Sequence, residues 1–450
     1  MAALRACTSS RFRYDIACLA VHAHALMKRL GRFLDGFAAC FTRRAHSGHA
    51  SRYVQGLLSD AESKNMEGLV SRLAHPGDYQ SLQHFITHST WEAARVWQRL
   101  RATLPDQEGY LLFDDTSIPK QGSSSAGVAR QYCGALGKTA NCQVVVTSAL
   151  RTKHATWPLQ MELFLPEVWC DDADRRERAH IPEELTHRTK IEMALAQLDL
   201  LIAAGLRIRC VLADAGYGES TEFRATIAAR ALCYSVGVGK NIKVFTRPPR
   251  FTESCLPSRP QLARGSSKPI SLDELAGNAA PQDWERLSWR KGTKGKLEAD
   301  FLILRVRPAH GWTHGQQHDE VWLICERTLG KDSVRKFYLS NLPASLSAKE
   351  LVRITHERWA IEMQYRDLKQ EVALDHFEGR TYPGLTRHLV LTALAYTFLQ
   401  LERQRSRASA LPSLNAIRRS VTEIVVAMLF ATGDRFARMV ADFARDPPPI

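Results

Sequence analysis

Two short apolar runs of this chain each end in an acidic residue. Tyr110–Phe113 leads into Asp114-Asp115-Thr116, and Cys210–Ala213 leads into Asp214. Apolar runs of this length, bounded by turn-forming residues, are typical of buried strands. Helical segments alternate with these strands, so the pattern predicts an α/β core. Active sites of open α/β sheets lie at the carboxyl ends of strands, which makes the acidic residues the first candidates for catalysis.

A third acidic candidate, Glu362, lies in a helix that we expect to start near Ser347 or Ala348 and to run through Glu371. The order strand-Asp, strand-Asp, helix-Glu is that of a ribonuclease-H-like nuclease, with a mixed sheet and flanking helices. Helical spacing places Glu362 on one face with three cations, Arg358, Arg366 and Lys369. The alternative is a solvated helix face on which Glu362 and Arg366 form an ordinary ion pair.

Three such carboxylates suit the cleavage of a phosphodiester bond. This reaction needs an activated water and a stabilised leaving oxygen, which two Mg²⁺ ions roughly 3.5–4 Å apart supply. Mg²⁺ prefers oxygen ligands, and we expect Mn²⁺ to substitute for it. The predicted catalytic and metal-binding residues are therefore Asp114, Asp115, Asp214 and Glu362.

The first ligand position is ambiguous between Asp114 and Asp115. Side chains alternate along a strand, so Asp114 and Thr116 share one face and Asp115 points to the other. The Asp-x-Thr spacing favours Asp114, whereas Asp115 is the ligand if the strand ends one residue later. An acidic residue at a strand end also commonly caps a turn, as Asp214 would do before Gly216 and Gly218.

Composition favours a nucleic acid partner. Lys and Arg total 61 against 47 acidic residues, a formal net charge of +14, which concentrates polyanions near the protein. A basic protein that does not bind DNA would have the same charge. The ten cysteines include no CxxC pair, so we expect reduced thiols, no structural zinc, and a cytoplasmic, nucleoid-associated protein. No apolar stretch is long enough to predict a membrane span.

The chain divides into five expected segments. An all-helical unit that we expect to contact DNA is followed by an α/β region, a β-rich region with several Trp and Tyr residues, a pair of helices and a basic helical tail. Within the third segment, residues 246–270 have the Pro, Ser and Arg content of a linker. The predicted boundaries are 1–105, 106–245, 246–345, 346–405 and 406–450.

The sequence resembles the DDE transposases of bacterial insertion sequences, in the branch with a β-rich insertion between the second Asp and the Glu. In this family the last helix carries Tyr, Arg, Glu and Lys in order. Arg358, Glu362 and Lys369 match that order, whereas the Tyr position holds Thr355. The likeness runs from about residue 53 to 403 and is carried by segments 113–122, 127–143, 213–218, 357–369 and 374–380.

The resemblance implies cut-and-paste transposition. Water would cleave one strand at the element end, and the freed 3′-hydroxyl would attack target DNA at the same site. A homodimer on the terminal inverted repeats would handle the two ends, and Trp289 or Trp322 of the insertion would stack on an extruded base. The alternative, which residue type and strand context favour for either Trp, is a core position between strands. The expected DNA contacts are Lys120, Arg130, Lys138, Trp289, Lys294, Arg358, Arg366 and Lys369.

Three other functions fit parts of the pattern. A nuclease with the same core would cut without joining, and a transposase-derived DNA-binding protein would do neither. A metal-dependent phosphatase could use the acidic cluster Asp171, Asp172 and Asp174, although its charged surroundings favour an exposed loop. DNA cleavage dependent on Mg²⁺, followed by joining to a second DNA, distinguishes these functions.

Overall fold

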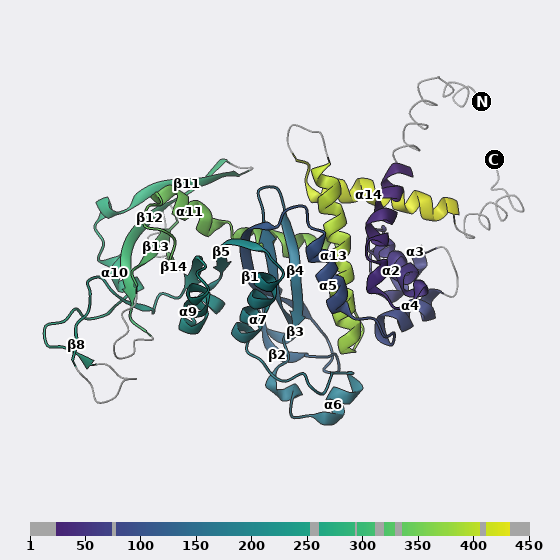
Figure 1. The fold of residues 1–450 in the computed structure, drawn as a ribbon, viewed down its shortest axis with the longest axis horizontal. Helices are drawn as coiled ribbons and strands as arrows, with labels where there is room; N and C mark the ends of the chain where they lie inside the picture. The colour runs from purple at the N-terminus through teal and green to yellow at the C-terminus, as the bar shows by residue number, and fades with distance from the viewer. Residues whose placement is uncertain are drawn as a thin grey trace, which may run out of the picture.

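The computed structural model describes seven segments of the chain. They comprise residues 24–73, 78–252, 261–292, 295–310, 319–328, 335–405 and 411–432. Within them, a central mixed sheet lies between a helical unit at one end and a β-rich unit at the other (Figure 1).

The N-terminal helical unit packs against a long helix from the end of the chain. Residues 24–35 are helical, and three of the helices that follow pack against α13 (Tyr382–Gln404). Tyr53, Phe85 and Trp97 are buried in their common core. Residues 1–23 lie outside the described residues. The other elements of this unit are η1 (Ala38–Cys40), α2 (Arg44–Leu57), α3 (Met66–Arg72), α4 (Asp78–Thr87) and α5 (Ala93–Ala102).

The first half of the central sheet combines parallel and antiparallel strands. β1 (Glu108–Pro119) lies between the parallel β5 (Arg207–Ala213) and the antiparallel β3 (Lys138–Arg151), and β5 is also parallel to β6 (Tyr234–Val238). β3 is long enough to pair with two further strands along its other edge. These are β2 (Ala129–Cys133) and β4 (Thr156–Leu163).

The β-rich region extends the same sheet. β14 (Arg335–Ser340) pairs antiparallel with β6, which links β13 (Val321–Arg327) and β12 (Gly295–Pro308) to the core. The described residues therefore form one 12-stranded sheet across both regions. Its other strands are β7 (Lys243–Phe245), β10 (Ile270–Ser271) and β11 (Glu285–Gly292). A separate two-stranded sheet is formed by β8 (Phe251–Thr252) and β9 (Gln261–Leu262). Between β10 and β11 lie α10 (Leu272–Gly277) and η3 (Pro281–Asp283).

The strands of the core bury side chains on both faces. Leu112 and Leu212 belong to a core shared with α12 (Trp359–Val372) and α13, whereas Phe113 and Ala213 belong to a core shared with α7 (Lys190–Ala203) and α9 (Thr221–Ala229). This two-sided burial explains the unbroken apolar runs in the sequence. The remaining elements are η2 (Glu167–Trp169), α6 (Ala173–Arg178), α8 (Ala215–Gly218), α11 (Ala348–His356) and α14 (Leu414–Thr432).

The expected single helix from Ser347 to Glu371 is wrong in one respect, because a turn at Glu357–Arg358 divides it into α11 and α12. Its start is as expected, since Ser347 and Glu350 form a capping box. At the turn, Glu357 accepts a hydrogen bond from Arg151 of β3 at 2.9 Å. This contact with a remote strand fixes the junction and leaves no trace in helical periodicity.

Two further segments are only partly described. Of the expected linker 246–270, β8 and β9 are described and residues 253–260 lie outside the described part. Of the expected helical tail, α14 is described, whereas residues 406–410 and 433–450 are not. Among the helices that the structure does describe, none combines the length and hydropathy needed to cross a membrane.

Candidate active site

Asp114 and Asp214 lie side by side on neighbouring parallel strands. Phe113 is in register with Ala213, so the next residue of each chain segment is acidic. Side chains alternate along strands, which places both carboxylates on the face that α12 covers, together with Leu112 and Leu212. Asp214 also caps α8, because its Oδ1 accepts a hydrogen bond from the Gly216 amide at 2.9 Å.

Arg358, at the start of α12, connects the third acidic residue to this pair. Its Nη1 lies 3.3 Å from Asp114 Oδ2, and its Nη2 donates to Glu362 Oε1 one helical turn away. Glu362 thus pairs with Arg358 and not with Arg366, which instead contacts Asp367 at 3.4 Å. Burial alone would lower the pKa of Arg358, but Asp114, Glu362 and Asp214 together raise it above its ordinary value.

The two aspartates occupy a poorly solvated position beside like charge. Burial and, to a smaller extent, the neighbouring Asp214 raise the pKa of Asp114 to about 7, against the opposing effect of Arg358. Burial likewise raises the pKa of Asp214, again against the effect of Arg358. Carboxyl groups perturbed in this way by burial and by neighbouring carboxylates are typical of functional sites.

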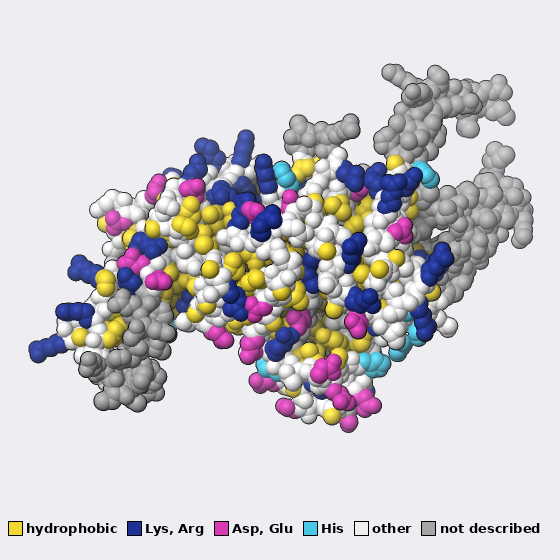
Figure 2. Space-filling model, viewed as in Figure 1, with side chains coloured by type: hydrophobic (Ala, Val, Ile, Leu, Met, Phe, Trp, Pro, Cys, Tyr) yellow, Lys and Arg dark blue, Asp and Glu magenta, His cyan; other side chains and the backbone are white. Residues whose placement is uncertain are grey.

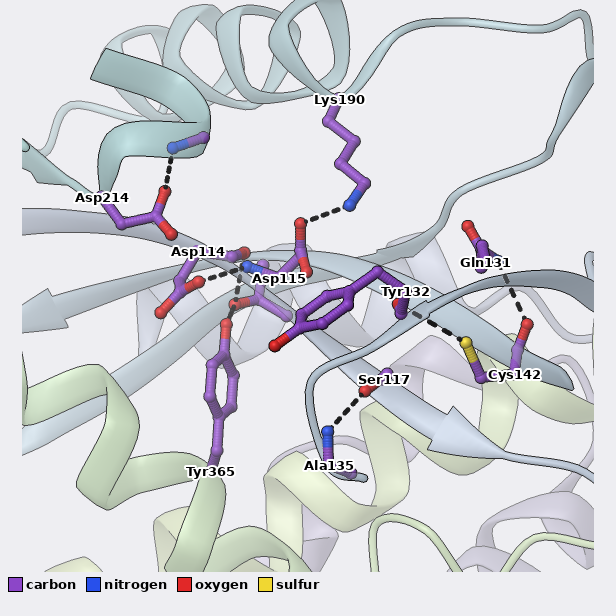
Figure 3. Close-up of polar contacts among 12 residues, drawn as sticks. Asp114, Asp115, Ser117, Gln131, Tyr132, Ala135, Cys142, Lys190, Asp214 and Tyr365 are labelled. Carbon is purple, nitrogen blue, oxygen red and sulfur yellow. Dashed lines mark hydrogen bonds and ion pairs between the residues drawn. The ribbon is translucent and has the colours of Figure 1, made fainter. Parts of the chain in front are cut away.

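Asp115 has a different environment, although it is adjacent to Asp114 in the chain. It points to the opposite face of β1, where its Oδ2 accepts a 2.7 Å hydrogen bond from Nζ of Lys190 at the start of α7 (Figure 3). Asp115 therefore already has a cationic partner, whereas Asp114 and Asp214 share the face that carries Glu362.

The donor set suits a hard divalent cation. Carboxylate oxygens are the ligands that Mg²⁺ and Mn²⁺ prefer, and a cation would stabilise the charged forms of Asp114 and Asp214, which burial and, less strongly, neighbouring carboxylates disfavour. Across the described segments, however, no three His, Cys, Asp or Glu side chains are close enough to surround one ion. Arg358 stands between Asp114 and Glu362, so these two carboxylates meet through its guanidinium.

Two tyrosines beside the aspartates were not singled out by sequence reasoning. From α12, the buried hydroxyl of Tyr365 shares a hydrogen bond with Thr147 Oγ1, which in turn donates to the backbone oxygen of Asp114 at 3.3 Å (Figure 3). Tyr217, in the turn after Asp214, is 2 % exposed. Both tyrosines occur in the segments that carry the family likeness, but only their closeness to the aspartates in the folded chain identifies them as residues of the site.

The expected DNA contacts occupy varied positions. Lys120 and Lys369 are partly buried and donate to the backbone oxygens of Phe377 and Ser117, the second at 2.9 Å. Arg130 and Lys138 are exposed on the β2–β3 hairpin, at the edge of the sheet. Lys294 lies outside the described residues.

A hollow of about 820 Å³ opens beside Glu362, between α11–α12 and the β11–β12 hairpin. Trp289 lines it and stacks on His356 with ring centroids 4.0 Å apart, whereas Trp322 lies elsewhere and donates to the Leu342 oxygen at 3.1 Å. Lys and Arg side chains gather along this edge of the molecule (Figure 2). Those that line the hollow are Arg151, Arg290, Lys291, Lys296, Lys336, Arg353 and Arg358.

The acidic cluster at 171–174 does not resemble a metal site. Asp172 caps α6, since its Oδ1 accepts a hydrogen bond from the Arg175 amide at 2.8 Å. All three acidic side chains of this cluster are exposed, as expected for a surface loop.

Comparison with known proteins agrees with the resemblance seen in the sequence. The family model described as "DDE superfamily endonuclease" matches residues 36–296. A curated relative, "Probable transposase for insertion sequence element IS701" from Microchaete diplosiphon, is 32% identical over 198 residues, which cover 43% of this chain and 49% of the relative. The matched region thus spans about half the length of that relative.

Proposed function

Because the chain belongs to the DDE superfamily of endonucleases, we propose that it is a DNA transposase that cuts insertion-sequence ends and joins the freed 3′-hydroxyl to target DNA. Its relative is named as a transposase of an insertion sequence element, which supports an insertion sequence as the element that this chain moves. The observation that carries the proposal is the pair Asp114 and Asp214 at adjacent strand ends, on the face where Arg358 links Asp114 to Glu362.

The strand order supports a ribonuclease-H-like core. β4, β3, β1, β5 and β6 follow one another across the sheet, with β1, β5 and β6 parallel and β3 antiparallel to β1. In this interpretation residues 246–345 are an insertion that continues the sheet beyond β6, and α11–α13 complete the core. The helical unit within residues 1–105 would then contact DNA.

Asp114, Asp214 and Glu362 are the residues that would hold divalent cations, with Mg²⁺ as the expected ion. When bound, such ions supply an activated water and stabilise the leaving oxygen. The chain itself orients the carboxylates: Asp214 is fixed by the Gly216 amide and Asp114 by its neighbours on β1 and by Arg358. Arg358 adds a partly buried positive charge that would attract the scissile phosphate.

The basic hollow beside Glu362 offers a path for the DNA end. Its Arg and Lys side chains come from β11, β12, β14 and α11, so the expected insertion and the core both contribute. A polyanion lying there would pass Arg358 and reach the three carboxylates. Because an element has two ends, we propose that two copies of the chain act together on DNA.

The test uses the full chain, DNA carrying the terminal inverted repeats of its element, and Mg²⁺. We expect cleavage at the repeat ends, joining of the cut end to a second DNA, and loss of both with Asp214→Asn. Cleavage without joining would identify a nuclease, and binding without cleavage a DNA-binding protein. Cleavage that Asp214→Asn leaves unchanged would refute the proposed site.

A further inference from the structure

Tyr217 lies at the junction between the two strands that carry the aspartates. It belongs to α8, which begins directly after Asp214. Its ring lies 5.8 Å from that of Phe223, which in turn lies 6.1 Å from Phe113, the residue before Asp114. The side chain thus packs with Phe223 and Phe113 in the core on the face where Asp115 points.

The hydroxyl of Tyr217 contributes nothing to the stability of this arrangement. It is buried and has no hydrogen-bond partner within the described part of the chain. A buried polar group without a partner is destabilising by about 1–3 kcal/mol, and phenylalanine would make the same ring contacts without this penalty. A hydroxyl kept in such a position is typical of a site where function, and not folding, uses the group.

The groups around this hydroxyl are hydrogen-bond acceptors. Burial raises the pKa of Tyr217 well above its ordinary value, and Asp115, Asp114 and Asp214 raise it further, in that order. The hydroxyl therefore keeps its proton at neutral pH and is an unused donor among three carboxylates. Lys190 bonds Oδ2 of Asp115, and within the described residues Oδ1 of this aspartate, on the face where Tyr217 packs, accepts no hydrogen bond.

Tyr365 provides a contrast on the opposite face. Its hydroxyl is hydrogen-bonded to Thr147 Oγ1, which donates to the backbone oxygen of Asp114. From that side β1 is therefore fixed through its main chain. No comparable bond within the described residues fixes the Asp115 side chain other than that from Lys190.

We propose that Tyr217 is a positioning residue, whose hydroxyl donates to Asp115 when the site holds its divalent cations and so fixes the end of β1 that presents Asp114. This inference rests on the proposed function, because it assumes that Asp114 and Asp214 hold those cations. Tyr217 touches neither DNA nor the cations in this role. It acts through Asp115 and the backbone that Asp115 shares with Asp114.

The test compares Tyr217→Phe with the unchanged full-length chain. We expect an unfolding temperature that is the same or higher, because the unpaired hydroxyl is gone. Calorimetric titration with Mn²⁺ should show about tenfold weaker binding, the size of effect typical for residues that orient metal ligands. The Mg²⁺ concentration for half-maximal DNA cleavage should rise by a similar factor, with the KM for DNA unchanged.

Tyr396→Phe is the matched control. Tyr396 is equally buried, but its hydroxyl accepts a 2.6 Å bond from Gln400 on α13, so its loss should lower stability without altering Mn²⁺ binding. Asp115→Asn combined with Tyr217→Phe tests the proposed acceptor, since the two effects should not add. Unchanged Mn²⁺ binding by Tyr217→Phe would overturn the inference. Normal Mn²⁺ binding with no DNA cleavage by the unchanged chain would instead contradict the proposed function.

Discussion

Asp114 and Asp115 are neighbours in the chain but belong to two different electrostatic environments. Asp114 faces α12, lies beside Asp214 and has a pKa raised to about 7 by burial and by that second carboxylate. Asp115 faces α7 and is paired with Lys190 at 2.7 Å. Around Asp114, three carboxylates share the single positive charge of Arg358. The charge of Asp115 is instead balanced by Lys190. Because side chains alternate along a strand, a shift of one residue along β1 is enough to separate a candidate metal ligand from a structural ion pair.

The strongest test of this comparison replaces each aspartate by asparagine. Asp114→Asn should lower the rate of DNA cleavage on the order of 10³-fold or more, because a carboxylate that holds a catalytic cation is lost. Asp115→Asn should lower it about tenfold, as expected for a residue that acts through its neighbour. Single-turnover cleavage of end-containing DNA measures both rates. The reverse order of effects would show that Asp115 is the ligand.

The raised pKa of Asp114 predicts a pH dependence of cation binding. Below pH 7 the carboxyl group is protonated and must release its proton to hold a cation, so affinity should fall by about tenfold for each pH unit between 7 and 5. Titration with Mn²⁺ across this range measures the slope. Asp114→Asn should reduce the dependence of Mn²⁺ affinity on pH. If that dependence were unchanged in the variant, the proton released on cation binding would belong to another group.

The same shift predicts how stability varies with pH in the presence of a chelator. The folded state binds the Asp114 proton with a pKa of about 7, against an ordinary value of 3.8. The resulting stabilisation is complete below pH 3.8 and is lost as pH rises through about 7. Thermal melting should therefore show a contribution from Asp114 that declines over this window and is absent in Asp114→Asn. An increase in that contribution with pH would contradict the assignment.

Removal of the partner of Asp115 should have a smaller effect. Lys190→Met leaves Asp115 without its ion pair, but both side chains are partly solvated, so the loss of stability should be at most about 1 kcal/mol. Cleavage should slow several-fold, because the end of β1 is less firmly held. Urea denaturation and cleavage rates check the two effects. If Lys190→Met abolished activity, Lys190 would have a direct role in the reaction.

The smallest expected effect concerns the other face of β1. Tyr365→Phe removes one bond to Thr147, which keeps its bond to the Asp114 backbone, so the free energy of unfolding should fall by about 1 kcal/mol. Urea denaturation measures this change, and Mn²⁺ binding should stay the same. A large drop in Mn²⁺ affinity would mean that Tyr365, and not only Tyr217, positions the carboxylates.

Sequence reasoning found most elements because their signals are local. The apolar runs before Asp114 and Asp214 and the helix start near Ser347 follow from spacing and residue type within a few positions. The division between α11 and α12 did not, because it depends on the contact of Glu357 with Arg151 of a remote strand. The pairing of Glu362 with Arg358 in place of Arg366 is a choice between two equal helical spacings, which only the position of Asp114 decides.

Residue type and spacing along the chain were enough to show that acidic residues end two buried strands, that a third acidic residue lies on a later helix and that the chain is basic. Only the tertiary structure decided that Asp114 and not Asp115 shares a face with Asp214, that Arg358 lies between Asp114 and Glu362, and that the β-rich region continues the central sheet through β14 and β6. The physical reason is one of range. Periodicity and capping act over a few residues, whereas strand pairing and the balance of charge at a site depend on groups that lie far apart in the chain.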